Sequence, residues 1–125
     1  MVLIDTHALI WALYEPSSLT STAREAIMKN DCVISIASLW EMSIKIAKGQ
    51  LILKDTIVEI ADRCLHMGVD ILPILPEDCQ RIQDLPDIHK DPFDRIIIAR
   101  ALIRDIPLIT KDEHIWQYDD VEKIW

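Results

Sequence analysis

The sequence is poor in glycine, in paired cysteines and in positive charge. Glycine occurs only 2 times in 125 residues, which is too few for the glycine-rich loop that holds phosphates in P-loop enzymes. The three cysteines, Cys32, Cys64 and Cys79, are far apart and form no C-x-x-C pair. We therefore expect buried free thiols rather than a disulfide framework or a zinc ribbon.

Long apolar runs are also missing. No stretch approaches the roughly 18 to 20 residues that cross a bilayer, and the N-terminal segment MVLIDTHALIWAL carries an acid in its middle and no basic leader. The hydrophobic content of 50% is sufficient to bury one core in a chain of this length. We therefore expect one soluble cytoplasmic domain that spans residues 1–125.

Acidic residues outnumber basic ones by 21 to 13, and the net charge is -8. This balance argues against a broad basic surface for nucleic acid, because Lys and Arg usually provide the affinity for the phosphate backbone. Acids that converge on one point attract divalent cations instead, and a bound cation can receive a phosphate. The placement of the acids therefore decides between a metal site and an acidic surface.

Short apolar runs alternate with amphipathic segments along the chain. This alternation predicts βαβ units and hence a parallel sheet of four to five strands with helices on both faces. We expect strands at Val2–Ile4, Cys32–Ile36, Ile71–Leu75, Pro107–Thr110 and Val121–Ile124. Helices are expected at residues 6–13, 21–29, 39–48, 56–67, 76–83 and 92–104, with a helical turn at 115–117.

Two helix starts have clear local signals. Asp91 is followed by Pro92 and then by Asp94, which predicts an N-cap, a proline at the first helical position and an acid in the first turn. Ser38 and Glu41 form an S-x-x-E pattern that predicts a capping box and a helix from residue 39. Both patterns explain their acids without any function.

Four acids are nevertheless expected at one edge of the sheet, namely Asp5, Glu41, Asp94 and Asp112. Ligands of parallel sheets bind beyond the carboxyl ends of the strands, where three of the four acids would lie. The fourth, Asp94, would reach this edge if its helix starts there. Capping or a turn explains Glu41, Asp94 and Asp112 individually, whereas Asp5 ends a buried strand and needs a partner that offsets its desolvation.

Four strings, in this order, carry a family resemblance: MVLIDTHALIW, SIASLWEMSIKIAKGQL, HKDPFDRIIIARAL and IPLITKDEHI. Together they resemble the PIN-domain family, and most closely the VapC-like ribonuclease toxins of type II toxin-antitoxin pairs. The resemblance implies a three-layer α/β/α sandwich and a metal-dependent endoribonuclease that is a homodimer and is inhibited by a cognate antitoxin. The family's acidic quartet corresponds to Asp5, Glu41, Asp94 and Asp112.

The resemblance also implies roles for these residues. Mg²⁺ and Mn²⁺ prefer oxygen ligands, so Asp5 and Asp94 are expected to bind the metal directly, with Asp112 completing the site or holding a second metal. Glu41 would orient or deprotonate the attacking water. Asp91 is expected to keep the capping role.

Two alternatives stay open. A different Mg²⁺-dependent phosphohydrolase could use Asp5 as a nucleophile, although His7 stands where such enzymes carry a second aspartate. A PIN-like binding or regulatory module that does not cut RNA is the other alternative, and the presence of all four acids counts against it.

The remaining cations, histidines and aromatic residues are less specific. Arg100 and Arg104 form an i, i+4 row that predicts a solvated helix face, and the four histidines share no metal-ligand spacing. Tryptophans at helical spacing are typical of a core or an interface, but they could also stack on bases. The residues in question are Trp11, Trp40 and Trp116, and the cations that could meet RNA are Lys45, Lys48, Lys90, Arg95 and Lys111.

Overall fold

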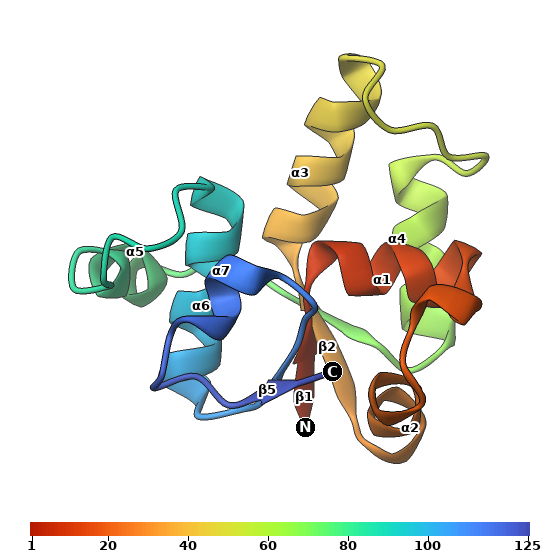
Figure 1. Ribbon diagram of the computed structural model, residues 1–125. Coiled ribbons are helices and arrows are strands. Elements are labelled where there is room, and N and C mark those ends of the chain that lie inside the picture. Colours follow the sequence, from red (N-terminus) through yellow and green to blue (C-terminus); the bar gives the residue numbers. More distant parts are fainter.

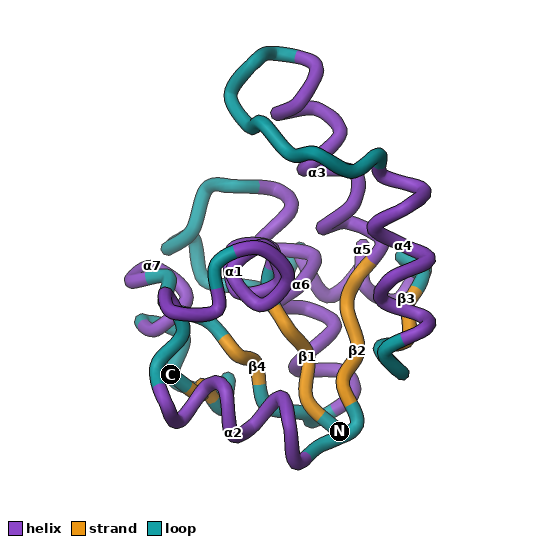
Figure 2. Tube along the Cα trace, turned by 90° about the vertical axis from the view of Figure 1, so that its right-hand side faces the viewer, coloured by secondary structure: helices purple, strands orange, loops and turns teal.

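The computed structural model describes residues 1–125 and contains one five-stranded sheet in the order β3-β2-β1-β4-β5. All neighbouring strands are parallel, which confirms the predicted sheet and its strand number. Figure 2 shows β1 between β2 and β4. The strands are β1 (Val2–Ile4), β2 (Cys32–Ser35), β3 (Asp70–Leu72), β4 (Leu108–Ile109) and β5 (Lys123–Ile124).

Helices cover both faces of the sheet and give three layers (Figure 1). Alternate strand residues point to opposite faces, so Ile4 and Ile34 join one core while Leu3 and Val33 join the other. The first core contacts α1 (Thr6–Tyr14), α2 (Ser21–Lys29), α3 (Ile36–Ala47) and α4 (Ile57–His66). The second contacts α5 (Pro76–Ile82), α6 (Pro92–Arg104) and α7 (Glu113–Trp116), and a short 3-10 helix, η1 (Pro16–Ser18), follows α1.

The topology brings four segments to one edge of the sheet. Strand β1 is central, with Leu3 opposite both Val33 and Leu108. The carboxyl ends of β1, β2 and β4 therefore lie side by side, and Asp5 N–H donates to the Ile109 carbonyl at 3.1 Å. Helix α6 runs back to the start of β4, so its own N-terminus lies at the same edge as these carboxyl ends.

The predicted capping box of Ser38 and Glu41 is wrong. Helix α3 begins three residues earlier, at Ile36, and Ser35 is its N-cap, with Oγ accepting from Ala37 N–H at 3.1 Å. Ser35 and Ser38 could both cap a helix as judged from the sequence. The helix starts after Ser35 because β2 ends at this residue. Ser38 lies buried inside α3, where its Oγ accepts from the Thr6 hydroxyl at 2.9 Å.

Two further expectations from the sequence are wrong. Arg100 is only 4% exposed, because its guanidinium pairs with buried Asp78 on α5, so the predicted solvated row holds only for Arg104. The local spacing could not reveal an acid on another helix. Cys32 and Cys64 are buried free thiols as expected, whereas Cys79 is exposed on α5. None of the helices combines the length and the apolar character needed to cross a bilayer.

Candidate active site

Asp5 is the buried acid at the end of the central strand. It caps α1, with Oδ1 accepting from Ala8 N–H at 2.8 Å, and it is only 3% exposed. The pKa of Asp5 is raised, because the effect of burial outweighs the hydrogen bonds from the Thr110 hydroxyl and Ala8 N–H, which act to lower it. The Thr110 Oγ1 also accepts from Asp112 N–H at 3.0 Å, so one threonine joins two of the predicted site residues.

Glu41 lies in the second turn of α3 and is 2% exposed. Its Oε2 accepts from Lys45 Nζ at 2.7 Å, one turn further along the same helix. Burial acts to lower the pKa of Lys45, but the hydrogen bond and the charge of Glu41 raise it overall, so the ammonium remains charged. The other carboxylate oxygen, Oε1, is buried and has no hydrogen-bond partner.

Asp94 lies in the first turn of α6, behind the N-cap Asp91. Asp91 Oδ1 accepts from Phe93 N–H at 2.8 Å, which confirms the predicted capping role. Burial raises the pKa of Asp94 to about 8, and the negative charges of four neighbouring carboxylates act in the same direction. These neighbours are Asp91, Glu41, Asp5 and Asp112.

Asp112 caps the short helix α7. Its Oδ1 accepts from His114 N–H at 2.8 Å and Ile115 N–H at 3.1 Å, and its Oδ2 contacts His89 Nε2 at 3.2 Å. Burial acts to raise the pKa of Asp112, but the hydrogen bonds from Ile115 and His89 outweigh it and lower the pKa overall. Asp112 therefore carries its charge more readily than Asp94.

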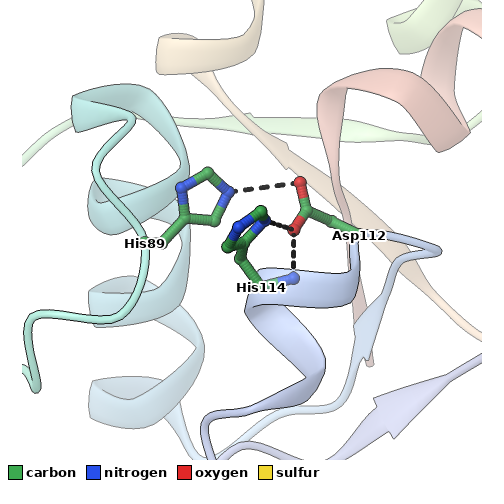
Figure 3. Close-up of side chains that lie close together, drawn as sticks. All are labelled: His89, Asp112 and His114. Atoms are coloured by element: carbon green, nitrogen blue, oxygen red, sulfur yellow. Dashed lines mark hydrogen bonds and ion pairs between the residues drawn. The ribbon is translucent and has the colours of Figure 1, made fainter.

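His89 contacts two of the carboxylates. Its Nε2 is 3.2 Å from Asp112 Oδ2, a contact that Figure 3 shows, and 3.1 Å from Asp94 Oδ2. Its Nδ1 accepts from Asp91 N–H at 3.1 Å, which requires a lone pair on Nδ1 and places the proton on Nε2. His89 is therefore a hydrogen-bond donor toward the carboxylates.

The cluster of His89, Asp112 and His114 also offers ligand atoms within 4.8 Å of one another (Figure 3). A metal on His89 Nε2 would need the ring proton on Nδ1 and would break the hydrogen bond from Asp91. A metal held by the two histidines would thus lose this hydrogen bond, whereas a metal held by the carboxylates would leave His89 in contact with Asp94 and Asp112.

The four predicted site residues lie near one another at the carboxyl edge of the sheet, since the charges of Asp5, Glu41 and Asp112 all act on Asp94. Ligand atoms within 4.8 Å of one another, however, come from His89, Asp112 and His114 rather than from the four acids. The donor set of the four acids consists of oxygens, which suits a hard cation such as Mg²⁺ or Mn²⁺. Two observations indicate that this set fits a cation: the unpartnered Glu41 Oε1 and the raised pKa of Asp94 among like charges. A divalent cation at this point would give Glu41 Oε1 a partner and would stabilise the charged form of Asp94.

The family model of the PIN domain matches residues 2–121. The chain belongs to the PIN-domain family. The family resemblance drawn from the sequence is thereby confirmed, and the PIN fold accounts for the three layers and the parallel sheet. No curated protein matches the sequence significantly.

Solved structures share this PIN fold. VapBC2 from Rickettsia felis, bound to a promoter DNA fragment, has a TM-score of 0.72 at 16% identity, over 98% of this chain and 97% of that chain. A toxin-antitoxin complex from Klebsiella pneumoniae has a TM-score of 0.64 at 23% identity, over 97% and 95%. VapC20 from Mycobacterium tuberculosis, a sarcin-ricin loop cleaving toxin, has a TM-score of 0.63 at 15% identity, over 98% and 99%.

The sequence did not reveal His89 as part of this PIN-domain site. Its position two residues before the N-cap of α6 is the only local signal, because a ring there can accept the N–H of the capping residue. Its contact with Asp112 joins the segment before α6 to the start of α7, which are 23 residues apart in the sequence. The spacing of the histidines along the chain could not predict this contact. Arg95, expected near RNA, instead donates to the backbone carbonyls of Pro86, His89 and Ile82.

Proposed function

We propose that residues 1–125 form a single nuclease domain that hydrolyses RNA phosphodiester bonds with Mg²⁺ or Mn²⁺ and acts as the toxin of a toxin-antitoxin pair. The observation that carries the proposal is the proximity of carboxylates from four segments around Asp94, whose pKa is raised to about 8 by burial and, in addition, by their charges. The repulsion between these carboxylates destabilises the fold, so folding alone does not account for it. Helix capping also does not account for the buried Glu41 near Asp94. Perturbed titrating groups gathered at one point are typical of functional sites.

Membership of the PIN-domain family supports the nuclease activity. The structural neighbours support the biological role, since they include VapBC and other toxin-antitoxin complexes and a toxin that cleaves the sarcin-ricin loop. The all-oxygen donor set supports the choice of metal.

The residues have distinct chemical roles in this proposal. Asp5 and Asp94 would hold the cation, and Asp112 would complete its site or hold a second one. The cation supplies charge neutralisation at the phosphate and lowers the pKa of water. Glu41 Oε1 has no partner and is free to accept a proton from the attacking water, while Lys45 holds Oε2 in place.

Cleavage of RNA by the purified protein tests the proposal. We expect activity with Mg²⁺ or Mn²⁺, no activity with EDTA, and a loss of at least about 100-fold in Asp5→Asn and Asp94→Asn. Asp62→Asn, an exposed acid on α4, is the matched control and should cleave like the parent. Cleavage at the parent rate by both site variants would disprove the site, and a parent that binds RNA without cutting it would identify a binding module.

The proposed partners are a cognate antitoxin and a second copy of this chain. Exposed apolar side chains before, on and directly after α4 offer a surface for an apolar segment of an antitoxin, namely Ile52, Val58, Leu65 and Met67. Co-expression with the product of a neighbouring small gene should give a complex that co-purifies and no longer cleaves RNA. Sedimentation of the protein alone should give the mass of a homodimer, and a monomer would refute that part.

A further inference from the structure

A hollow of about 360 Å³ adjoins the carboxylates on one side. Figure 1 shows that the start of α1 lies close to the segment between β4 and α7, and these two segments form the walls. Two of the proposed metal ligands belong to the lining, so a ligand in this hollow would lie next to a phosphate bound at the acids. The lining residues are Asp5, His7, Trp11, Lys111, Asp112 and Glu113.

The aromatic wall of the hollow is held in place before any ligand binds. The half-buried Trp11 ring packs against the Trp125 ring, with centroids 5.7 Å apart. The exposed His7, one turn earlier on α1, has its ring centroid 5.9 Å from that of Trp11. Lys111 Nζ lies 5.8 Å from the centroid of the Trp11 ring. A packed indole, a second ring and one exposed ammonium therefore line a space that is otherwise acidic.

These groups match the parts of a nucleotide. A base stacks on aromatic side chains whatever its sequence, and the lysine can leave the ring to pair with a backbone phosphate. Packing against Trp125 explains why Trp11 is partly buried, but it does not explain why the indole borders a hollow that contains catalytic carboxylates.

We infer that this hollow binds one unpaired nucleotide of the RNA, adjacent to the phosphate that is cleaved, with its base stacked on Trp11 and its phosphate contacted by Lys111. The inference rests on the proposed ribonuclease function and adds to it a requirement for single-stranded substrate at this position. A base held in a duplex could not enter the hollow without unstacking.

The test uses a short RNA that the parent cleaves and versions of it that lack one base at each position around the cleavage site. Removal of the base that occupies the hollow should raise KM of the parent by at least about fivefold. Trp11→Leu should raise KM for the intact RNA by a similar factor and should remove the penalty for that missing base. Trp11→Phe, which keeps a ring, should retain most of the penalty.

Trp40→Leu is the matched control, because Trp40 is an exposed tryptophan on α3 that lies outside the hollow. It should keep the full penalty for the missing base, and thermal unfolding should show that each variant is folded. The inference is overturned if Trp11→Leu keeps the parent KM, if its penalty for the missing base is unchanged, or if the penalty disappears in Trp40→Leu instead. A parent protein that cuts no RNA refutes the proposed function itself. The outcomes named above, in an active enzyme, refute only the inference that the hollow binds a nucleotide.

Discussion

The charge of Asp94 couples folding to pH. Its pKa in the folded protein is about 8, far above the ordinary value of 3.8, because of burial and the surrounding acids. Between these two values the folded protein binds a proton that the unfolded chain does not, so the free energy of unfolding falls as pH rises from about 4 to about 8. Stability at pH 8 is thus reduced by the arrangement that we propose binds the metal.

Asp94→Asn should relieve this cost. We expect the substitution to raise Tm at pH 8 in EDTA by about 5 °C or more, and to change Tm much less at pH 4 to 5, where Asp94 is already protonated. Thermal scans at both pH values measure the difference. Mg²⁺ or Mn²⁺ at pH 8 should raise Tm of the parent but not that of the variant, and an equal response of the two would contradict the role of Asp94 as a ligand.

His89 contacts Asp94 and Asp112 through Nε2, so in the proposed ribonuclease it would orient both carboxylates and its removal should act on kcat. We expect His89→Leu to lower kcat for RNA cleavage about 10- to 100-fold with little change in KM. His89→Gln keeps a donor near the position of Nε2 and should recover part of the loss. His66, exposed on α4, is the matched control, and His66→Leu should leave kcat unchanged. A rise in KM alone would instead indicate contact with RNA.

At the scale of elements, a buried ion pair joins α5 to α6. Arg100 and Asp78 are both buried, and Glu77 adds a contact to Arg100 at 3.6 Å. Removal of one partner leaves a buried charge without compensation, whereas removal of both does not. The pair thus determines which face of α5 packs against α6. Its net contribution to the free energy of unfolding is smaller than its burial alone would indicate.

Arg100→Met should therefore lower the free energy of unfolding by about 3 to 5 kcal/mol. The double variant Arg100→Met with Asp78→Leu should recover most of the loss, and Arg104→Met on the exposed side of α6 should stay within about 0.5 kcal/mol of the parent. Urea unfolding measures all three. A double variant that is less stable than Arg100→Met would mean that the ion pair is not the source of the loss.

Helix ends were predictable from the sequence wherever their signals are local. The Asp91-Pro92 start of α6 and the Thr56-Glu59 capping box of α4 lie where the sequence predicts helix starts, because each cap is made by residues within one turn. The start of α3 was not predictable, since Ser35 and Ser38 are both competent caps and the choice depends on where β2 leaves the sheet.

The candidate site was predictable to the extent that topology dictates it. Acids that follow parallel strands must share an edge, so the proximity of Asp5, Glu41 and Asp112 follows from the strand order, whereas Asp94 joins them because α6 begins at the same edge. His89 and the partners of Arg100 depend on which helix faces pack together, and residue spacing within one helix contains no information about another.

At the scale of the whole molecule, the net charge of -8 opposes the RNA binding that we propose. The proposed cation would then contribute to affinity as well as to chemistry, because five carboxylates lie near the point where a phosphate would bind. EDTA should weaken RNA binding by at least about tenfold, as measured by fluorescence anisotropy. RNA binding of equal strength with and without metal would contradict this account and would locate the contact elsewhere on the surface.

The strand order also ties the proposed activity to translation. Strand β1, which carries Asp5 at its end, is synthesised before all its neighbours but lies at the centre of the sheet, and one of these neighbours, β4, consists of residues 108–109. Asp5 N–H has its acceptor on Ile109, so the four acids cannot assemble before β4 and Asp112 have left the ribosome. A chain halted at Arg104 should remain protease-sensitive and unable to cut RNA.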